Sequence, residues 1–211
     1  WAVLLVRYDT TGALDRTFEV VRSLCSPDED GSACVGLSAR RIVALPDGRL
    51  LVLATHPSGL SPSRLLLFLP DGRIDESFGD AGILVVPAAL EQIALAPDGG
   101  IAGVGHDAQG FVVLRLDADL ALDRQFGARG LRSFSLVRGA ELQTFRHVAV
   151  QSDGGVLAGG VVEAEAGAPA TALARFTADG PPDPSFSDHG WVVGAPRSDL
   201  VPGVSPEAGP I

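Results

Sequence analysis

The residues of this chain that could do chemistry are clustered carboxylates, four histidines and one pair of cysteines. Asp117, Asp119 and Asp123 begin with the i, i+2 spacing of a calcium-binding loop, but the glycine bend and final glutamate of such a loop are missing. The acidic run 28–30 could also hold Ca²⁺, yet it lacks alternating ligand spacing. We therefore assign no catalytic, cofactor-binding or metal-binding residue from the sequence.

The four histidines fall at different distances from the Asp-Gly pairs that recur along the chain. His56 and His106 follow such a pair at similar distances, His147 precedes a predicted inner strand, and His189 lies in a turn. A shared metal site would need these side chains to converge. Their different positions predict surface or loop histidines instead.

The two cysteines enclose a polar, glycine-containing loop. Cys25 and Cys34 are the whole cysteine content of the chain. This spacing favours a local disulfide and an oxidising compartment, and the alternative is two free thiols in a cytosolic protein. Zinc is disfavoured because two thiolates without a neighbouring histidine do not complete a zinc site.

Motifs for nucleophilic catalysis and phosphate binding are missing from the sequence. It contains no Gly-x-Ser-x-Gly elbow and no phosphate-binding loop, and the Gly-Val-Gly segment 103–105 is not followed by a helical pattern. A pair of carboxylates acting on a glycoside stays open, because the distances between acidic side chains are not visible in a sequence.

Two alternating patterns must position all of these residues. One is Leu-Asp-x-x-Phe, whose phenylalanines are spaced by 60, 48 and 60 residues, and the other is an Asp-Gly pair, which begins at 47, 98 and 153. The apolar runs between them are four to six residues long and bounded by Gly, Pro and Asp, which is typical of strands. The phenylalanines are Phe18, Phe78, Phe126 and Phe186.

The period of about 50 residues, with four predicted strands in each unit, indicates an all-β fold. Four antiparallel strands per unit, repeated radially, form a β-propeller blade, and the alternative is a stack of sandwich-like modules. We predict a partial blade at 1–24, full blades at 40–87, 91–137 and 146–194, and a Pro/Gly-rich tail or linker at 195–211. This gives about three and a half blades within the repeat region 1–194.

The repeated aspartates are predicted to cap turns, and the phenylalanine after each is predicted to pack between blades. An arginine stands eight residues before the aspartate in three units, so we expect an ion pair in each. In the second unit Leu67 takes the arginine position, and Asp75 should lack that partner. The expected pairs are Arg7–Asp15, Arg115–Asp123 and Arg175–Asp183.

The segments 93–99 (IALAPDG) and 122–130 (LDRQFGARG) together resemble the delta-sixty repeat, a bacterial β-propeller family. The resemblance covers about residues 1–194, with departures at Glu19, Leu120 and Pro182. It implies a repeat domain of large exported or surface proteins. It carries over no functional residue, because the repeated motif is structural.

The net charge of −10 disfavours nucleic acid and anionic membrane surfaces as partners. No apolar run reaches transmembrane length and no signal peptide is visible, but the sequence begins inside a predicted strand and has no Met, so we expect a piece of a longer protein. Both ends of the repeat array should expose sheet edges, which would associate with another chain or with further blades of the parent chain.

These observations predict a non-enzymatic propeller scaffold or binding module of an exported, cell-surface or periplasmic bacterial protein, with a protein or glycan partner and no cofactor. The alternative is a hydrolase or lyase acting on a carbohydrate or lactone, with acidic residues or a metal at the channel mouth. An enzyme would bring carboxylates or histidines from different blades together.

Overall fold

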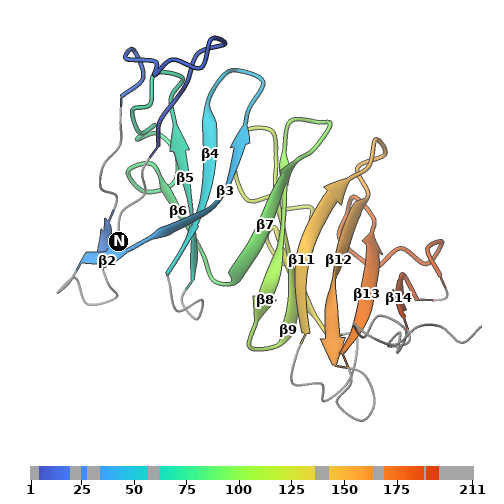
Figure 1. Ribbon diagram of the computed structural model, residues 1–211. Coiled ribbons are helices and arrows are strands. Elements are labelled where there is room, and N and C mark those ends of the chain that lie inside the picture. Colours follow the sequence, from blue (N-terminus) through green and yellow to red (C-terminus); the bar gives the residue numbers. More distant parts are fainter. Residues whose placement is uncertain are drawn as a thin grey trace, which may run out of the picture.

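The computed structural model describes residues 5–19, 25–27, 34–56, 62–135, 143–163, 169–187 and 189–194. This part of the chain is all-β: three four-stranded antiparallel sheets stand side by side, with a two-stranded sheet before them (Figure 1). The described ranges contain no helix, and so none long and apolar enough to cross a membrane. The all-β fold of four-stranded antiparallel blades that the repeats predict is confirmed.

Each sheet is built from four consecutive strands joined by short turns. Neighbouring strands along the chain are neighbours in the sheet, which is the topology of a propeller blade. The two-stranded sheet pairs β1 (Cys25–Pro27) with β2 (Cys34–Gly36). The first sheet contains β3 (Ser38–Ala44), β4 (Leu50–Thr55), β5 (Ser63–Phe68) and β6 (Ile83–Val86). The second contains β7 (Ala89–Leu95), β8 (Ile101–Asp107), β9 (Gly110–Leu116) and β10 (Leu131–Phe134). The third contains β11 (Gln143–Val150), β12 (Val156–Glu163), β13 (Pro169–Phe176) and β14 (Trp191–Val193).

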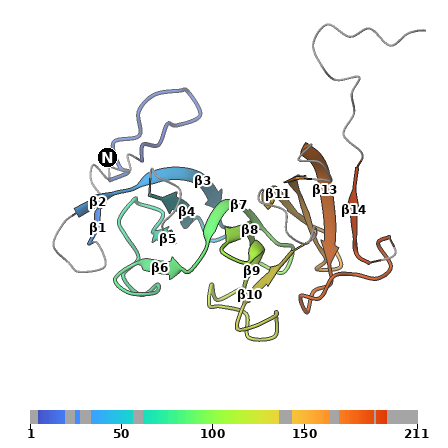
Figure 2. The same cartoon turned by 90° about the horizontal axis from the view of Figure 1, so that it is seen from below.

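The first strands of the three sheets are the inner strands of the array. β7 contacts both β3 and β11, and these three strands run along one side of the row of sheets, with β6 and β10 on the other side (Figure 2). The middle strands of the first sheet are covered on one face by the N-terminal segment and on the other by the second sheet, so every residue of β5 (SRLLLF) is buried. A strand buried on both faces has an apolar run in place of alternation.

The hairpin between the first two strands of each sheet is closed by the repeated Asp-Gly pair. The glycine has a φ between 83° and 87° in all three sheets, a conformation that costs glycine little. The aspartate Oδ1 accepts the backbone N–H two residues further on, at 2.9–3.0 Å. The three pairs are Asp47-Gly48, Asp98-Gly99 and Asp153-Gly154.

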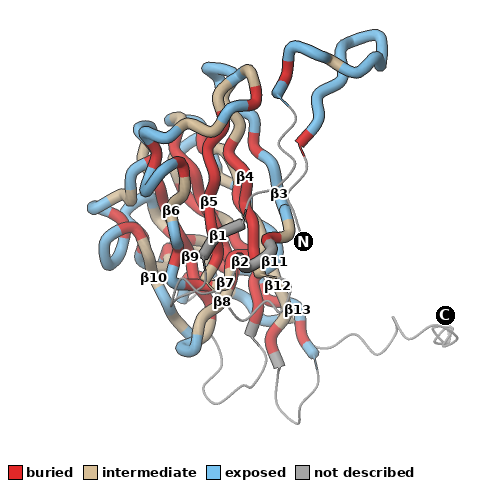
Figure 3. The backbone as a smooth tube through the Cα atoms, turned by 90° about the vertical axis from the view of Figure 1, so that its left-hand side faces the viewer, coloured by how far each residue is buried: buried red, intermediate tan, exposed pale blue. Residues whose placement is uncertain are grey.

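Apolar cores fill the spaces between sheets, while the described turns are largely exposed (Figure 3). The phenylalanine that follows the outer turn of one unit packs against the next sheet: Phe18 on the first, Phe78 on the second and Phe126 on the third. These three are almost fully buried, whereas Phe186 of the last sheet is half-buried. Packing of this phenylalanine between blades is therefore confirmed where a following sheet is described.

The two ends of the predicted array are only partly covered by the structure. Within the expected partial blade, residues 5–19 form a turn held by an isolated bridge between Tyr8 and Leu14, and Phe18 anchors this segment to the first sheet. The expected tail at 195–211 lies outside the described residues.

Candidate functional site

The repeated aspartates cap turns, as the sequence predicts. In every unit the carboxylate Oδ1 accepts the backbone N–H two residues further on, and in three of them a hydroxyl at that position donates a second hydrogen bond of 2.5–2.7 Å. Asp117 accepts the N–H groups of Asp119 and Ala121 in the same way. The four repeated aspartates are Asp15, Asp75, Asp123 and Asp183.

These hydrogen bonds favour the ionised carboxylate. The pKa of Asp15 falls to about 2, chiefly because of the Thr17 hydroxyl, then the Thr17 amide and the Arg7 guanidinium. The pKa of Asp75 is also lowered, first by the Ser77 hydroxyl. The ionised carboxylates of Asp15 and Asp75 are thus held by hydrogen bonds within their own turns.

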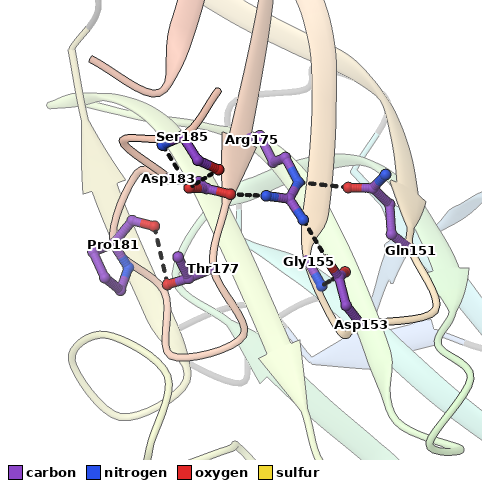
Figure 4. A network of polar contacts seen from close by, with 8 residues as sticks. All are labelled: Gln151, Asp153, Gly155, Arg175, Thr177, Pro181, Asp183 and Ser185. Atoms are coloured by element: carbon purple, nitrogen blue, oxygen red, sulfur yellow. Dashed lines mark hydrogen bonds and ion pairs between the residues drawn. The ribbon is translucent and has the colours of Figure 1, made fainter. Parts of the chain in front are cut away.

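Two of the three expected arginine–aspartate pairs are present. Arg7 Nε lies 2.8 Å from Asp15 Oδ2. In the third sheet Arg175 contacts Asp183, and its Nη2 also donates to Asp153 Oδ2 at 2.5 Å (Figure 4). The guanidinium thus joins the hairpin aspartate to the turn aspartate of one blade.

The second sheet departs from this expectation. Arg115 contacts Asp98, the hairpin aspartate, and makes no ion pair with Asp123. The Arg115 side chain is only 5% exposed, and its Nη1 is buried without a hydrogen-bond partner among the described residues. The prediction for Arg115 and Asp123 is wrong because the guanidinium turns toward the hairpin and not toward the outer turn.

In the first sheet Asp75 lacks the arginine partner of the other units, as expected, but it has another one. Leu67 leaves the usual arginine position empty, but Arg49 of the neighbouring hairpin contacts both Asp47 (2.6 Å) and Asp75 (3.4 Å). In the third sheet Gly155 stands at the position of Arg49, and a Cβ on it would lie 2.9 Å from Arg175 Nη2. Equivalent spaces in the two sheets therefore hold the guanidinium of Arg49 in the first sheet and that of Arg175 in the third.

Histidines, cysteines and acidic loops form no reactive cluster in the described part. No group of three or more His, Cys, Asp or Glu side chains there could hold a metal ion. His106 lies in β8, His147 lies within β11 and not before it, and the His189 ring packs 5.6 Å from Trp191. The cysteine side chains, and with them the expected disulfide, fall outside the described part, as does the acidic run 28–30.

A β-bulge recurs at the same place on the three inner strands. The register shifts by one residue between positions 39 and 41 in β3, 90 and 92 in β7, and 145 and 147 in β11. The extra residues are Arg40, Glu91 and Arg146. A bulge leaves one residue unpaired and redirects its side chain, and bulges are common beside functional sites.

The residues opposite these bulges are small for a physical reason. Gly105 and Gly160 face the bulges of β7 and β11, and a Cβ on either would overlap the backbone carbonyl of Ala89 or Thr144. In β4 the matching residue is Ala54. Each bulge therefore depends on both strands of its pair: the inner strand supplies the extra residue, and the second strand supplies the small residue opposite it.

Each bulge is followed by a second polar residue, and we call the six residues the inner row. Its members are Arg40, Arg41, Glu91, Gln92, Arg146 and His147. The three arginines are exposed and none makes an ion pair with a described residue; Arg40 Nε donates to Thr55 Oγ1 at 3.0 Å. Gln92 Oε1 accepts the Val148 N–H at 2.8 Å and so links β7 to β11. The row carries three positive charges and one negative charge in a chain of net charge −10.

A groove between the first and second sheets is a second candidate site. Its volume is about 620 Å³, and Phe78, Leu120 and Leu122 form part of its apolar wall. Arg124 and Arg129 stand at its edge and make no ion pair with a described residue. Leu120 occupies the position of a turn glycine at a φ of 63°.

One family model matches the chain, over residues 151–186, and its description is a domain of unknown function (DUF5122) beta-propeller. The match covers β12, β13 and the turn that ends at Phe186. This stretch is therefore similar to a β-propeller repeat. No curated protein and no solved structure matches the chain. The third sheet, which contains this stretch, has the same strand order as the two sheets before it.

Proposed function

We propose that this chain is a non-enzymatic binding module whose inner row takes an acidic segment of a protein partner. The observation that carries the proposal is the repeated bulge, which places Arg40, Glu91 and Arg146 at the same position of three adjacent inner strands. Propellers commonly bind at the mouth of the channel, where inner strands and loops of several blades meet.

The charge of the inner row favours an acidic partner. Its arginines are exposed and make no ion pair with a described carboxylate, so no local ion pair competes with a ligand. The rest of the chain is strongly acidic, which would repel an acidic partner from other faces and direct it to this row.

A protein partner fits better than a glycan or a small substrate. Sugar rings stack on exposed aromatic side chains, and the inner row has none. A glycoside hydrolase needs two carboxylates at a fixed separation, and Glu91 is the single carboxylate of the row. The resemblance to delta-sixty repeats and the expected disulfide support an exported or cell-surface bacterial protein.

A labelled decaglutamate peptide is the probe for this proposal. We expect binding at low ionic strength that weakens with salt, because exposed charges are screened. The double variant Arg40→Glu/Arg146→Glu should abolish it. The matched control Arg16→Glu/Arg73→Glu makes the same change of charge at exposed arginines outside the row and the groove, and it should retain most of the binding. Equal loss in both double variants would refute the site, and binding of a glycan array in place of the peptide would refute the partner class.

A further inference from the structure

The N-terminal segment contacts the first sheet through Phe18 and the residue after it. Phe18 lies against the turn of Gly72, where an added Cβ would be 3.1 Å from the ring and 2.5 Å from the Glu19 carbonyl oxygen. Glu19 N–H donates to the Asp71 carbonyl oxygen at 2.6 Å. The phenylalanine and the residue after it thus dock onto the Asp-Gly turn of the next unit.

The junction of the second and third sheets repeats this contact. Phe126 lies against Gly180, where an added Cβ would be 3.3 Å from the ring. Gly127 N–H donates to the Asp179 carbonyl oxygen at 3.2 Å, and Gly127 has a φ of 55°. Two junctions within one chain therefore use the same pair of surfaces.

The N-terminal segment presents an unoccupied copy of the receiving surface. Gly12 stands at the turn position of Gly72 and has a φ of 83°, but no described atom lies within 4 Å of an added Cβ. On the same side of this segment Val6 and Tyr8 are 42% and 62% exposed. Their counterparts in the first sheet, Leu66 and Phe68, are fully buried. We call Val6, Tyr8, Thr11 and Gly12 the head.

The third sheet presents an unoccupied copy of the donating surface. Ser187 follows Phe186 with a φ of 58°, the conformation that Gly127 adopts at the internal junction. Leu173 is 41% exposed, whereas Val113, its counterpart in the second sheet, is fully buried against the third sheet. Val192 pairs with Leu173 and is exposed on the same face. We call the surface formed by Leu173, Phe186, Ser187 and Val192 the tail; this name does not include the segment 195–211.

We propose that the tail of one copy of this chain binds the head of a second copy. Phe186 then covers Gly12 of the second copy, and Ser187 N–H donates to its Thr11 carbonyl oxygen, as Gly127 donates to Asp179 within the chain. The second copy is the occupant because the interface continues one that the chain already makes twice. This inference is independent of the inner row and of its ligand.

Head and tail are different surfaces, so the contact is heterologous. A copy that has bound through its tail keeps a free head, and assembly continues until a ring closes or an open array forms. The apolar residues of both surfaces would leave water together, which stabilises association in proportion to the area buried. Self-association of this kind depends on concentration.

Sedimentation velocity over a dilution series tests the proposal with two variants. Phe186→Ser removes the tail side chain, and Gly12→Asp places a carboxylate in the head, at a φ of 83° that strains aspartate less than most side chains. Each variant alone should be monomeric at concentrations where the unaltered chain associates. The dissociation constant for self-association should rise on the order of tenfold or more. A mixture of the two should form heterodimers and nothing larger, because one intact head and one intact tail remain.

Matched controls and opposite outcomes separate this interface from other contacts. Thr10→Asp makes the same charge change beside the head, and Val193→Ser removes an exposed apolar side chain from the other face of β14; both should associate like the unaltered chain. Thermal unfolding followed by circular dichroism checks that each variant is folded. A monomer at every concentration would overturn the proposal, and so would association that survives in both head and tail variants.

Discussion

Truncating Phe126 and Phe186 to alanine should have very different effects, although the two residues occupy the same position of the repeat. Phe126 is fully buried in the core between the second and third sheets, where it lies against Gly180. Phe186 has no following sheet among the described residues and is half-buried. The comparison isolates the contribution of the next blade, since the turn and the residue type are the same.

The expected magnitudes follow from burial. Removing a fully buried phenylalanine costs about 3–5 kcal/mol, because the transfer free energy is lost and a cavity remains. Removing the half-buried ring should cost about 1–2 kcal/mol in the monomer. With a urea slope of about 1–3 kcal/mol/M, the unfolding midpoint should fall by about 2 M for Phe126→Ala and by less than about 1 M for Phe186→Ala.

Equilibrium urea unfolding, followed by circular dichroism, measures both variants at a protein concentration where sedimentation shows monomers. A third variant, Phe126→Leu, should lie between Phe126→Ala and the unaltered chain because it fills part of the cavity. Equal destabilisation by Phe126→Ala and Phe186→Ala would refute the idea that this ring stabilises by packing on the following sheet.

Three further predictions concern single interactions. A carbon-detected NMR titration should place the pKa of Asp15 near 2, below the ordinary 3.8, because the Thr17 hydroxyl and amide favour the carboxylate. The ionised Asp15 therefore stabilises the folded state above pH 3.8, and this contribution is lost as the pH falls through about 2. Arg49→Gly should lower the free energy of unfolding by less than about 1 kcal/mol. Leu67→Arg replaces a buried leucine, and it should cost less in the Arg49→Gly variant than in the unaltered chain, because its guanidinium can then reach Asp75; a double-mutant cycle without coupling would contradict this. Thiol titration of the denatured, unreduced protein should find both cysteines bonded, whereas two reactive thiols would remove the argument for an oxidising compartment.

The strands and their hairpins were predictable from the sequence because their causes are local. A Pro-Asp-Gly or Ser-Asp-Gly segment between short apolar runs specifies a turn wherever it occurs, and the period of the phenylalanines specifies stacked units. The capping role of the repeated aspartates is local too, since each bonds to amides within its own turn.

The arginine contacts could be predicted only in part because they depend on two strands at once. Arg49 reaches Asp75 from a hairpin 26 residues earlier, and the empty position at Leu67 gave no sign of it. The Arg115 guanidinium makes its ion pair with Asp98, whereas the Asp123 N–H donates to the Arg115 backbone carbonyl oxygen. The sequence did contain one signal for the different arginine contacts. The second and third sheets have a glycine, Gly100 and Gly155, at the position where the first sheet has Arg49.

The inner row was missed because its residues share a backbone position and not a side-chain type. The repeat shows arginine, glutamate and arginine at the bulges, so no motif marks them. Two signals do exist: a pair of polar residues precedes the apolar part of each inner strand, and Gly105 and Gly160 stand in strands that otherwise favour larger side chains.

Amide chemical-shift mapping with decaglutamate tests the proposed binding module most directly. The account predicts the largest shifts on β3, β7 and β11 around Arg40, Glu91 and Arg146, and their loss in the variant Arg40→Glu/Arg146→Glu. Shifts confined to the groove beside Arg124 and Arg129, or shifts that persist in that variant, would contradict it.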